Sequence, residues 1–129
     1  MAEATKAAAA DPLAWACEAA RAADDKQGKD TVVLDVGAVL EITGWFVITS
    51  AHNSRLVRTI AETVEERVVA VDGPKPLRVE GLDSGEWILL DYGDFVVHVF
   101  SDEARSYYDL ERLWSDVARI DWQADAATS

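Results

Sequence analysis

Apolar residues recur at helical spacing near the start of the chain. Leu13, Cys17 and Ala20 lie three or four positions apart, which places them on one side of a helix. Asp11 can cap that helix, because it precedes a proline that fits the first helical position. The pattern predicts a helix over residues 12–26, with the single cysteine on its buried side.

A second apolar stripe predicts another helix further along the chain. Its members are Leu56, Val57, Ile60, Ala61, Val64 and Val68. Asn53 or Ser54 can cap this helix, and the Asp-Gly-Pro loop at 72–74 ends it. The opposite side carries charged residues, as expected for a face in contact with water.

Runs rich in β-branched and aromatic residues predict strands between and after these helices. The runs cover 31–36, 45–50, 76–80, 86–92 and 95–100. The tight turn at 92–94 makes the last two an antiparallel hairpin, and a final helix capped by Asp102 is expected over 102–114. Strands joined by long crossovers pair in parallel. We therefore expect an α/β fold with a mixed sheet of about five strands flanked by helices.

The length of 129 residues is typical of a single domain. We expect this domain over 11–115, after a flexible alanine-rich segment (1–10) and before a C-terminal extension (116–129). The apolar runs are shorter than a membrane span, and the chain does not open with a signal-like segment. A cytoplasmic location is therefore expected.

The charge balance limits the kinds of molecule that the protein is expected to bind. Twenty-four acidic residues against twelve basic ones give a net charge of -12, which disfavours binding to nucleic acid or to anionic membranes. From Val79 to Ala104 there is no lysine or arginine, but seven carboxylates are present. A basic protein is the partner that such a segment favours.

Aromatic residues gather in the same segment and in the expected final helix. The chain has five tryptophans, which is many for a small core. They pack between helix and sheet, or they remain exposed as anchors of a protein interface. The candidate partner-binding residues are Trp87, Leu89, Leu90, Asp91, Tyr92, Asp94, Tyr108, Leu110 and Trp114. Strand alternation places Trp87, Leu89 and Asp91 on one sheet face. It places Leu90 and Tyr92 on the other.

Catalytic chemistry finds weaker support. Asp35, Asp91 and Asp94 lie near strand ends and could hold magnesium for nucleotidyl transfer, but aspartate beside a turn glycine is usually there to shape the turn. No glycine-rich phosphate loop with a lysine is present.

His98 lies within an apolar strand, where a lone histidine is usually structural. We expect no catalytic residue, cofactor or metal, and the single Cys17 excludes an internal disulfide.

Several of these segments resemble the ribosomal silencing factor family, also called iojap-like proteins. The resemblance covers about residues 28–114. It is carried by KDTVVLDV at 29–36, ITGWFVI at 42–48, SRLVRTIAETVEE at 54–66, VEGLDSGEWILLDYGDFVVHVF at 79–100 and YYDLERLW at 107–114.

This resemblance implies a fold related to nucleotidyltransferases, without their catalytic signature. It also implies binding to ribosomal protein fourteen of the large ribosomal subunit, which blocks joining of the small subunit and represses translation. Homodimers are common in similar proteins. A metal-dependent nucleotidyltransferase-like enzyme using Asp35, Asp91 and Asp94 is the alternative.

Overall fold

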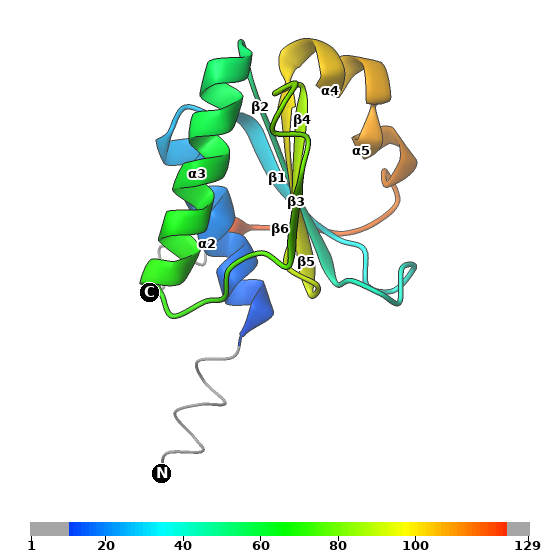
Figure 1. Ribbon diagram of the computed structural model, residues 1–129. Coiled ribbons are helices and arrows are strands. Elements are labelled where there is room, and N and C mark those ends of the chain that lie inside the picture. The colour runs from blue at the N-terminus through cyan, green and yellow to red at the C-terminus, as the bar shows by residue number, and fades with distance from the viewer. Residues whose placement is uncertain (1–10, 124–129) are drawn as a thin grey trace.

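A mixed sheet with the strand order β3-β4-β5-β2-β1-β6 forms the centre of the molecule (Figure 1). The computed structural model describes residues 11–123. The strands are β1 (Lys29–Asp35), β2 (Trp45–Ala51), β3 (Arg78–Glu80), β4 (Trp87–Asp91), β5 (Phe95–Ser101) and β6 (Arg119–Ile120). Strands β2 and β5 pair in parallel, and the other described neighbours pair antiparallel. The predicted α/β fold with a mixed sheet is confirmed, with six strands instead of about five.

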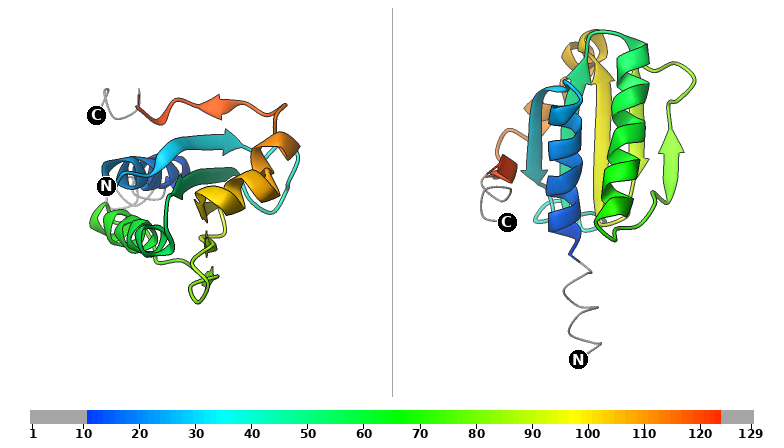
Figure 2. Two further views of the ribbon diagram at one scale, coloured as in Figure 1. Left: turned by 90° about the horizontal axis from the view of Figure 1, so that it is seen from above. Right: turned by 90° about the vertical axis from the view of Figure 1, so that its left-hand side faces the viewer.

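Two long helices, α2 (Pro12–Asp25) and α3 (Ser54–Ala70), cover one face of the sheet (Figure 2). Both predicted caps are confirmed, because Asp11 Oδ1 accepts from the backbone N–H of Ala14 at 3.2 Å and Asn53 Oδ1 from that of Leu56 at 2.8 Å. The inner side of α2 is mostly alanine, which lets the helix lie close to the strands. Cys17 is buried there, as the spacing predicted.

The predicted helix over 102–114 is divided in two on the other face of the sheet. Helix α4 (Asp102–Tyr108) ends at Asp109, whose φ of 49° is left-handed, and α5 (Leu110–Leu113) follows. A left-handed residue cannot continue an α-helix, so the chain turns there. The predicted cap is also wrong. The Oγ of Ser101, not Asp102, accepts from the N–H of Ala104 at 3.1 Å.

The hairpin of β4 and β5 has the predicted turn. The backbone N–H of Tyr92 donates to the carbonyl of Phe95 at 2.9 Å. Gly93 has a φ of 85°, a backbone conformation that residues other than glycine rarely adopt. In the register of the hairpin, Leu89 lies opposite His98. The predicted strand over 76–80 is shorter in the structure and covers only the three residues of β3.

The chain beyond α5 returns to the sheet edge. Strand β6 pairs antiparallel with β1, with Ile120 opposite Val33, and the indole of Trp122 donates to the carbonyl of Thr31 at 3.0 Å. Residues 116–123, which were expected as part of an extension, therefore pack against the domain. The expected flexible segment at 1–10 and residues 124–129 lie outside the described residues. In the described part of the chain, no helix has the length and apolar character needed to cross a membrane.

Candidate partner-binding face

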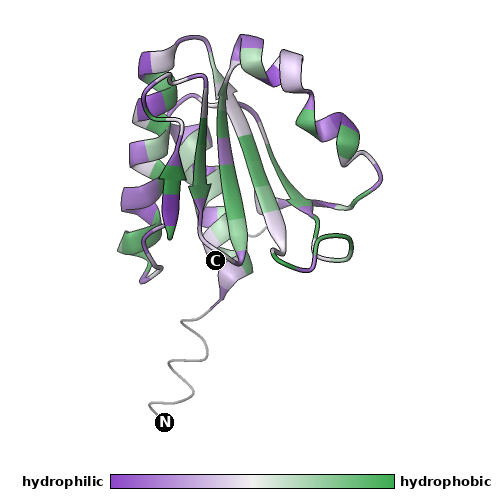
Figure 3. Cartoon of the chain, turned by 45° about the vertical axis from the view of Figure 1, so that its right-hand side comes forward, coloured by the Kyte–Doolittle hydropathy of each residue, from purple (hydrophilic) through white to green (hydrophobic). Residues whose placement is uncertain are grey.

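The sheet face opposite α2 and α3 is only partly covered. Helices α4 and α5 lie over one end of it, and among the described residues no helix crosses the lower parts of β4 and β5 as drawn in Figure 3. Apolar residues are nevertheless frequent along these strands (Figure 3). We call this sheet surface, together with α4, α5 and the loops at its lower rim, the open face.

Two predicted binding residues lie on the wrong side of the sheet. Leu90 is 0% exposed and Tyr92 is 6% exposed, and both pack in the core beneath the two long helices. The ring of Tyr92 stacks on Phe95 with centroids 4.5 Å apart. Because alternate residues of a strand point to opposite faces, neither side chain reaches the open face. Leu90 and Tyr92 are therefore removed from the candidate set.

Trp87, Leu110 and Trp114 do lie on the open face, but they pack inward. Each is partly buried against a second apolar cluster formed by the sheet and by α4. Trp114 meets the ring of Phe46 edge-on at 5.6 Å. For these three residues, packing between helix and sheet is the better description. Tyr108 is different, because it is 50% exposed while its ring lies 4.7 Å from that of Trp87.

Several strongly exposed apolar side chains of the open face were not in the predicted set. Tyr107 is 82% exposed beside Tyr108, Ile42 is 85% exposed, and Leu77 is 72% exposed. Ile42 and Leu77 lie in loops next to glycine or proline. Ile42 falls between the predicted strands 31–36 and 45–50, where a large apolar residue is a signal that could have identified it. Leu77 falls within the predicted strand 76–80, which is shorter in the structure, so the sequence pattern contains no sign of its exposure.

A groove runs between these loops and the sheet. Its volume is about 440 Å³. The apolar lining comes from Leu40, Ile42, Phe46, Leu77, Leu89 and Val96, and the polar lining from Thr43, Arg78, Glu80, Asp91 and His98. The groove therefore combines apolar walls with a small number of polar groups, as ligand and anchor sites do. Leu89 and Asp91 are the predicted residues that the groove contains.

The acidic residues at the rim are not equally available. One oxygen of Asp91 accepts from the backbone N–H of Gly93 at 2.8 Å, and the other lies 3.5 Å from the guanidinium of Arg78. Asp94 is exposed, and within residues 11–123 no hydrogen bond or ion pair holds its carboxylate. Asp94 is therefore the carboxylate best placed to meet a basic partner.

His98 lies in the middle of the open face and is 4% exposed. Its Nδ1 accepts a hydrogen bond from the indole N–H of Trp87 at 3.1 Å, and its ring meets Phe46 edge-on at 4.6 Å. Burial lowers the pKa of His98 to about 4, so the imidazole is neutral near pH 7. These contacts support the structural role predicted for this histidine.

The aspartates considered for magnesium do not assemble a metal site. In residues 11–123, no group of three or more histidine, cysteine, aspartate or glutamate side chains is arranged to hold a metal ion. Asp35 accepts from the backbone N–H of Gly37 at 3.3 Å, and Asp91 does the same for Gly93. Both therefore shape turns, which was the favoured interpretation.

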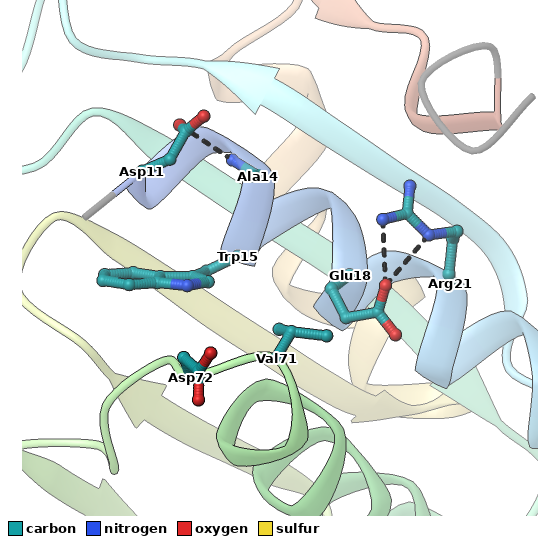
Figure 4. Close-up of a pocket in the computed structure, with 7 residues that line it drawn as sticks. All are labelled: Asp11, Ala14, Trp15, Glu18, Arg21, Val71 and Asp72. Carbon is teal, nitrogen blue, oxygen red and sulfur yellow. Dashed lines mark hydrogen bonds and ion pairs between the residues drawn. The ribbon is translucent and has the colours of Figure 1, made fainter. Parts of the chain in front are cut away.

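A smaller hollow lies between the start of α2 and the end of α3 (Figure 4). Trp15 lies along it, with Asp11 and Glu18 nearby (Figure 4). These carboxylates already have partners within the protein. Asp11 caps α2, and Glu18 accepts from Arg21 and Arg67 at 2.9–3.1 Å. Of the three carboxylates that line the hollow, only that of Asp72 has no hydrogen bond or ion pair within residues 11–123, and the open face remains the stronger candidate.

Comparison with known proteins gives matches over most of the chain. The family model described as "Ribosomal silencing factor during starvation" matches residues 9–129. A Bacillus subtilis protein named Ribosomal silencing factor RsfS is 37% identical over 103 residues, which cover 80% of this chain and 86% of that protein. A crystal structure of a Chromobacterium violaceum protein is 35% identical with a TM-score of 0.72, covering 76% of this chain and 81% of the other. A Bacillus halodurans crystal structure is 33% identical with a TM-score of 0.67, covering 80% and 92%.

Proposed function

Since this chain belongs to the ribosomal silencing factor family, we propose that it represses translation by keeping the two ribosomal subunits apart. In this proposal the protein binds ribosomal protein fourteen of the large subunit through its open face. The bound protein then occupies space that the small subunit needs. The site of action is the cytoplasm.

The observation that carries the proposal is the uncovered apolar surface with an acidic border. Tyr107, Ile42 and Leu77 expose large apolar side chains around the sheet, and Asp94 presents a carboxylate in the β4–β5 turn, at the same end of the sheet as Ile42 and Leu77. Monomeric proteins rarely leave such surfaces open without a partner. Ribosomal proteins are generally basic, and a net charge of -12 favours a basic protein over bare RNA.

The mechanism is steric and needs no reaction. An interface of standard size, roughly 1,600 Å² in total, is enough for specific binding by a small domain. Exposed rings such as Tyr108 would provide apolar contact, and Asp94 would pair with a lysine or arginine and fix the orientation. We therefore propose that the protein acts without a catalytic residue, metal or cofactor.

Co-sedimentation tests the proposal directly. The protein is mixed with isolated large subunits and pelleted, and small subunits are then added to measure the fraction that forms whole ribosomes. We expect the protein to pellet with large subunits and to reduce that fraction in proportion to its occupancy. Failure of the wild-type protein to pellet with large subunits would overturn the proposed function.

A pair of charge-reversal variants places the contact on the molecule. Asp94→Lys is expected to weaken binding to large subunits about tenfold, because an attractive contact becomes a repulsive one. Glu62→Lys makes the same charge change on an exposed position of α3, on the other side of the sheet, and should bind nearly as the wild type does. Equal binding by both variants would mean that the open face is not the contact surface.

A homodimer is the alternative occupant of the open face. If two copies associate through Tyr107, Ile42 and Leu77, dimer formation and ribosome binding exclude one another. Sedimentation velocity of the protein with and without ribosomal protein fourteen separates the two arrangements. A dimer that persists in the complex would show that the dimer uses a different surface.

A further inference from the structure

Within residues 11–123, two buried polar atoms on the open face have no hydrogen-bond partner. They are Thr43 Oγ1 and His98 Nε2, and both residues line the groove described above. Thr43 is 9% exposed and His98 is 4% exposed. A buried polar group without a partner lowers stability, and native folds keep few of them. Two at one groove therefore suggest a ligand that supplies the missing partner.

The hydrogen bond from Trp87 determines what His98 can offer. Because Nδ1 accepts from the indole N–H at 3.1 Å, the neutral ring carries its proton on Nε2. The two ring nitrogens point in nearly opposite directions, and Trp87 is not among the residues that line the groove. The Nε2–H donor therefore points away from Trp87, and His98 itself is one of the residues that line the groove.

Thr43 is held in place by the backbone around it. The N–H of Gly44 donates to the carbonyl of Asp94 at 2.8 Å, and the carbonyl of Gly44 accepts from Val36 at 3.0 Å. The backbone at Thr43 is thus held next to the β4–β5 hairpin. The neighbouring side chain of Ile42 lines the same groove and is 85% exposed, so it has room to change its rotamer on binding.

The surroundings restrict the chemistry of that ligand. His98 Nε2 can only donate, and the Thr43 hydroxyl can also donate, so the ligand must carry an acceptor. Asp91, Glu80 and Arg78 line the same groove, and the charge of Arg78 is already shared between the two carboxylates, at 3.5 Å from Asp91 and 4.0 Å from Glu80. The charged lining is therefore acidic on balance, which disfavours a carboxylate or phosphate. Apolar walls favour a group with a hydrocarbon stem or backbone. The remaining class is a neutral acceptor, such as an amide oxygen or a main-chain carbonyl.

We propose that this groove receives a neutral hydrogen-bond acceptor from an inserted loop of the protein partner, with Thr43 and His98 as the residues that bind it. The inference rests on the proposed function, because it names what the partner places in the same face. Binding would then satisfy two donors that the free protein leaves unpaired. It would also give the interface specificity, since a partner without the acceptor leaves both groups buried and unsatisfied.

Thr43→Val provides a test in which stability and binding change in opposite directions. Valine has nearly the shape of threonine without the hydroxyl. If the hydroxyl is unpaired in the free protein, the variant should melt at the same temperature as the wild type or slightly above it. Its binding to isolated large subunits should weaken about tenfold, because the acceptor loses a donor in the complex. Thr63→Val is the matched control, since its hydroxyl bonds to Thr59 of α3 at 2.9 Å, away from the open face. This control should bind as the wild type does.

His98→Asn tests the second donor. The asparagine oxygen can take the place of Nδ1 and accept from Trp87, but no donor remains at the position of Nε2. We expect weaker binding to large subunits with an unchanged near-ultraviolet circular dichroism spectrum from the tryptophans. If this spectrum changes, Thr43→Val decides alone.

The outcomes separate this inference from the proposed function. Wild-type pelleting with full-strength binding by Thr43→Val overturns the inference and leaves the proposed function standing. A melting temperature several degrees lower for Thr43→Val also overturns it, because the hydroxyl would then already be bonded in the free protein. Absence of wild-type pelleting overturns both.

Discussion

The imidazole of His98 lies between two aromatic rings, with centroids 5.9 Å from Trp87 and 4.6 Å from Phe46. The indole hydrogen bond needs Nδ1 without a proton, and protonation would place two donors against each other. Burial lowers the pKa of His98 from 6.5 to about 4, because the charged imidazolium loses its contact with water there. A neutral His98 therefore helps to hold the side chains of Trp87 and Phe46 in their positions on the open face.

This shift predicts a specific pH dependence of stability. The pKa of His98 is lower in the folded state than in the unfolded state, so the unfolded state binds more protons between the two values. The contribution is complete above about pH 6.5 and is lost as the pH falls towards 4. Urea unfolding of the wild type and of His98→Asn at pH 7 and pH 5 measures it. The stability difference between the two proteins should shrink by on the order of 2 kcal/mol at pH 5.

Both proteins have the same carboxylates, which also titrate in this pH range. Their contribution cancels when the unfolding free energy of one protein is subtracted from that of the other. A difference in unfolding free energy that stays constant between pH 7 and pH 5 would contradict a buried, neutral His98.

At this scale the sequence predicts which residues share a face, but not which face stays open. The alternation along β4 correctly groups Trp87 with Leu89 and Asp91. It cannot show that α2 and α3 both pack on the side of Leu90 and Tyr92, because that depends on the path of the whole chain. Leu90 and Tyr92 are therefore buried for a reason outside their own segment.

Among the elements, α4 is held to the sheet by a small number of polar contacts. The Oγ of Ser101 accepts from the N–H of Ala104 and bonds to a carboxylate oxygen of Glu86 at 2.9 Å. The guanidinium of Arg105 donates to the carbonyls of Lys29 and Asp30 and to the hydroxyl of Ser50, at 2.7–3.0 Å. These bonds fix the helix that positions Tyr107 and Tyr108.

The cap of α4 can be tested with two neighbouring alanine substitutions. Ser101→Ala removes the cap and should lower the free energy of unfolding by about 1–2 kcal/mol. Asp102→Ala removes a partly exposed carboxylate that pairs with Lys29 at 2.8 Å, and an exposed pair of this kind contributes about 0–1 kcal/mol. Urea denaturation at pH 7 compares the two variants. A larger loss for Asp102→Ala would mean that Asp102 is the cap, as the sequence pattern predicted.

The elements that the sequence predicts well are those with a long periodic pattern or a clear turn. Helix α3 and the hairpin at 92–94 belong to this group. The left-handed Asp109 and the two-residue strand β6 do not, because neither has a pattern of its own. Strand β6 forms only where β1 offers a free edge, which is a property of the assembled sheet.

For the whole molecule, the distribution of apolar and acidic groups suggests a division of roles. The net charge of -12 acts at long range and increases the rate of encounter with a basic protein. The rings on the open face, such as Tyr107 and Tyr108, act only after contact, when water leaves the interface. Charge should therefore govern association and apolar contact should govern dissociation.

This division predicts different salt responses of the two rate constants. Stopped-flow tryptophan fluorescence with isolated ribosomal protein fourteen can measure both rates between about 0.05 M and 0.5 M salt, where screening grows strongly. The association rate constant should fall about tenfold or more, and the dissociation rate constant should change much less.

Two variants assign each effect to a surface. Tyr108→Ala should raise the dissociation rate constant and leave the salt response of association unchanged, because it removes apolar contact and no charge. Asp94→Lys should flatten the salt response more than Glu62→Lys, although both change the net charge by the same amount. If the two charge variants flatten it equally, attraction comes from the net charge of the molecule alone and the acidic border of the open face has no special role.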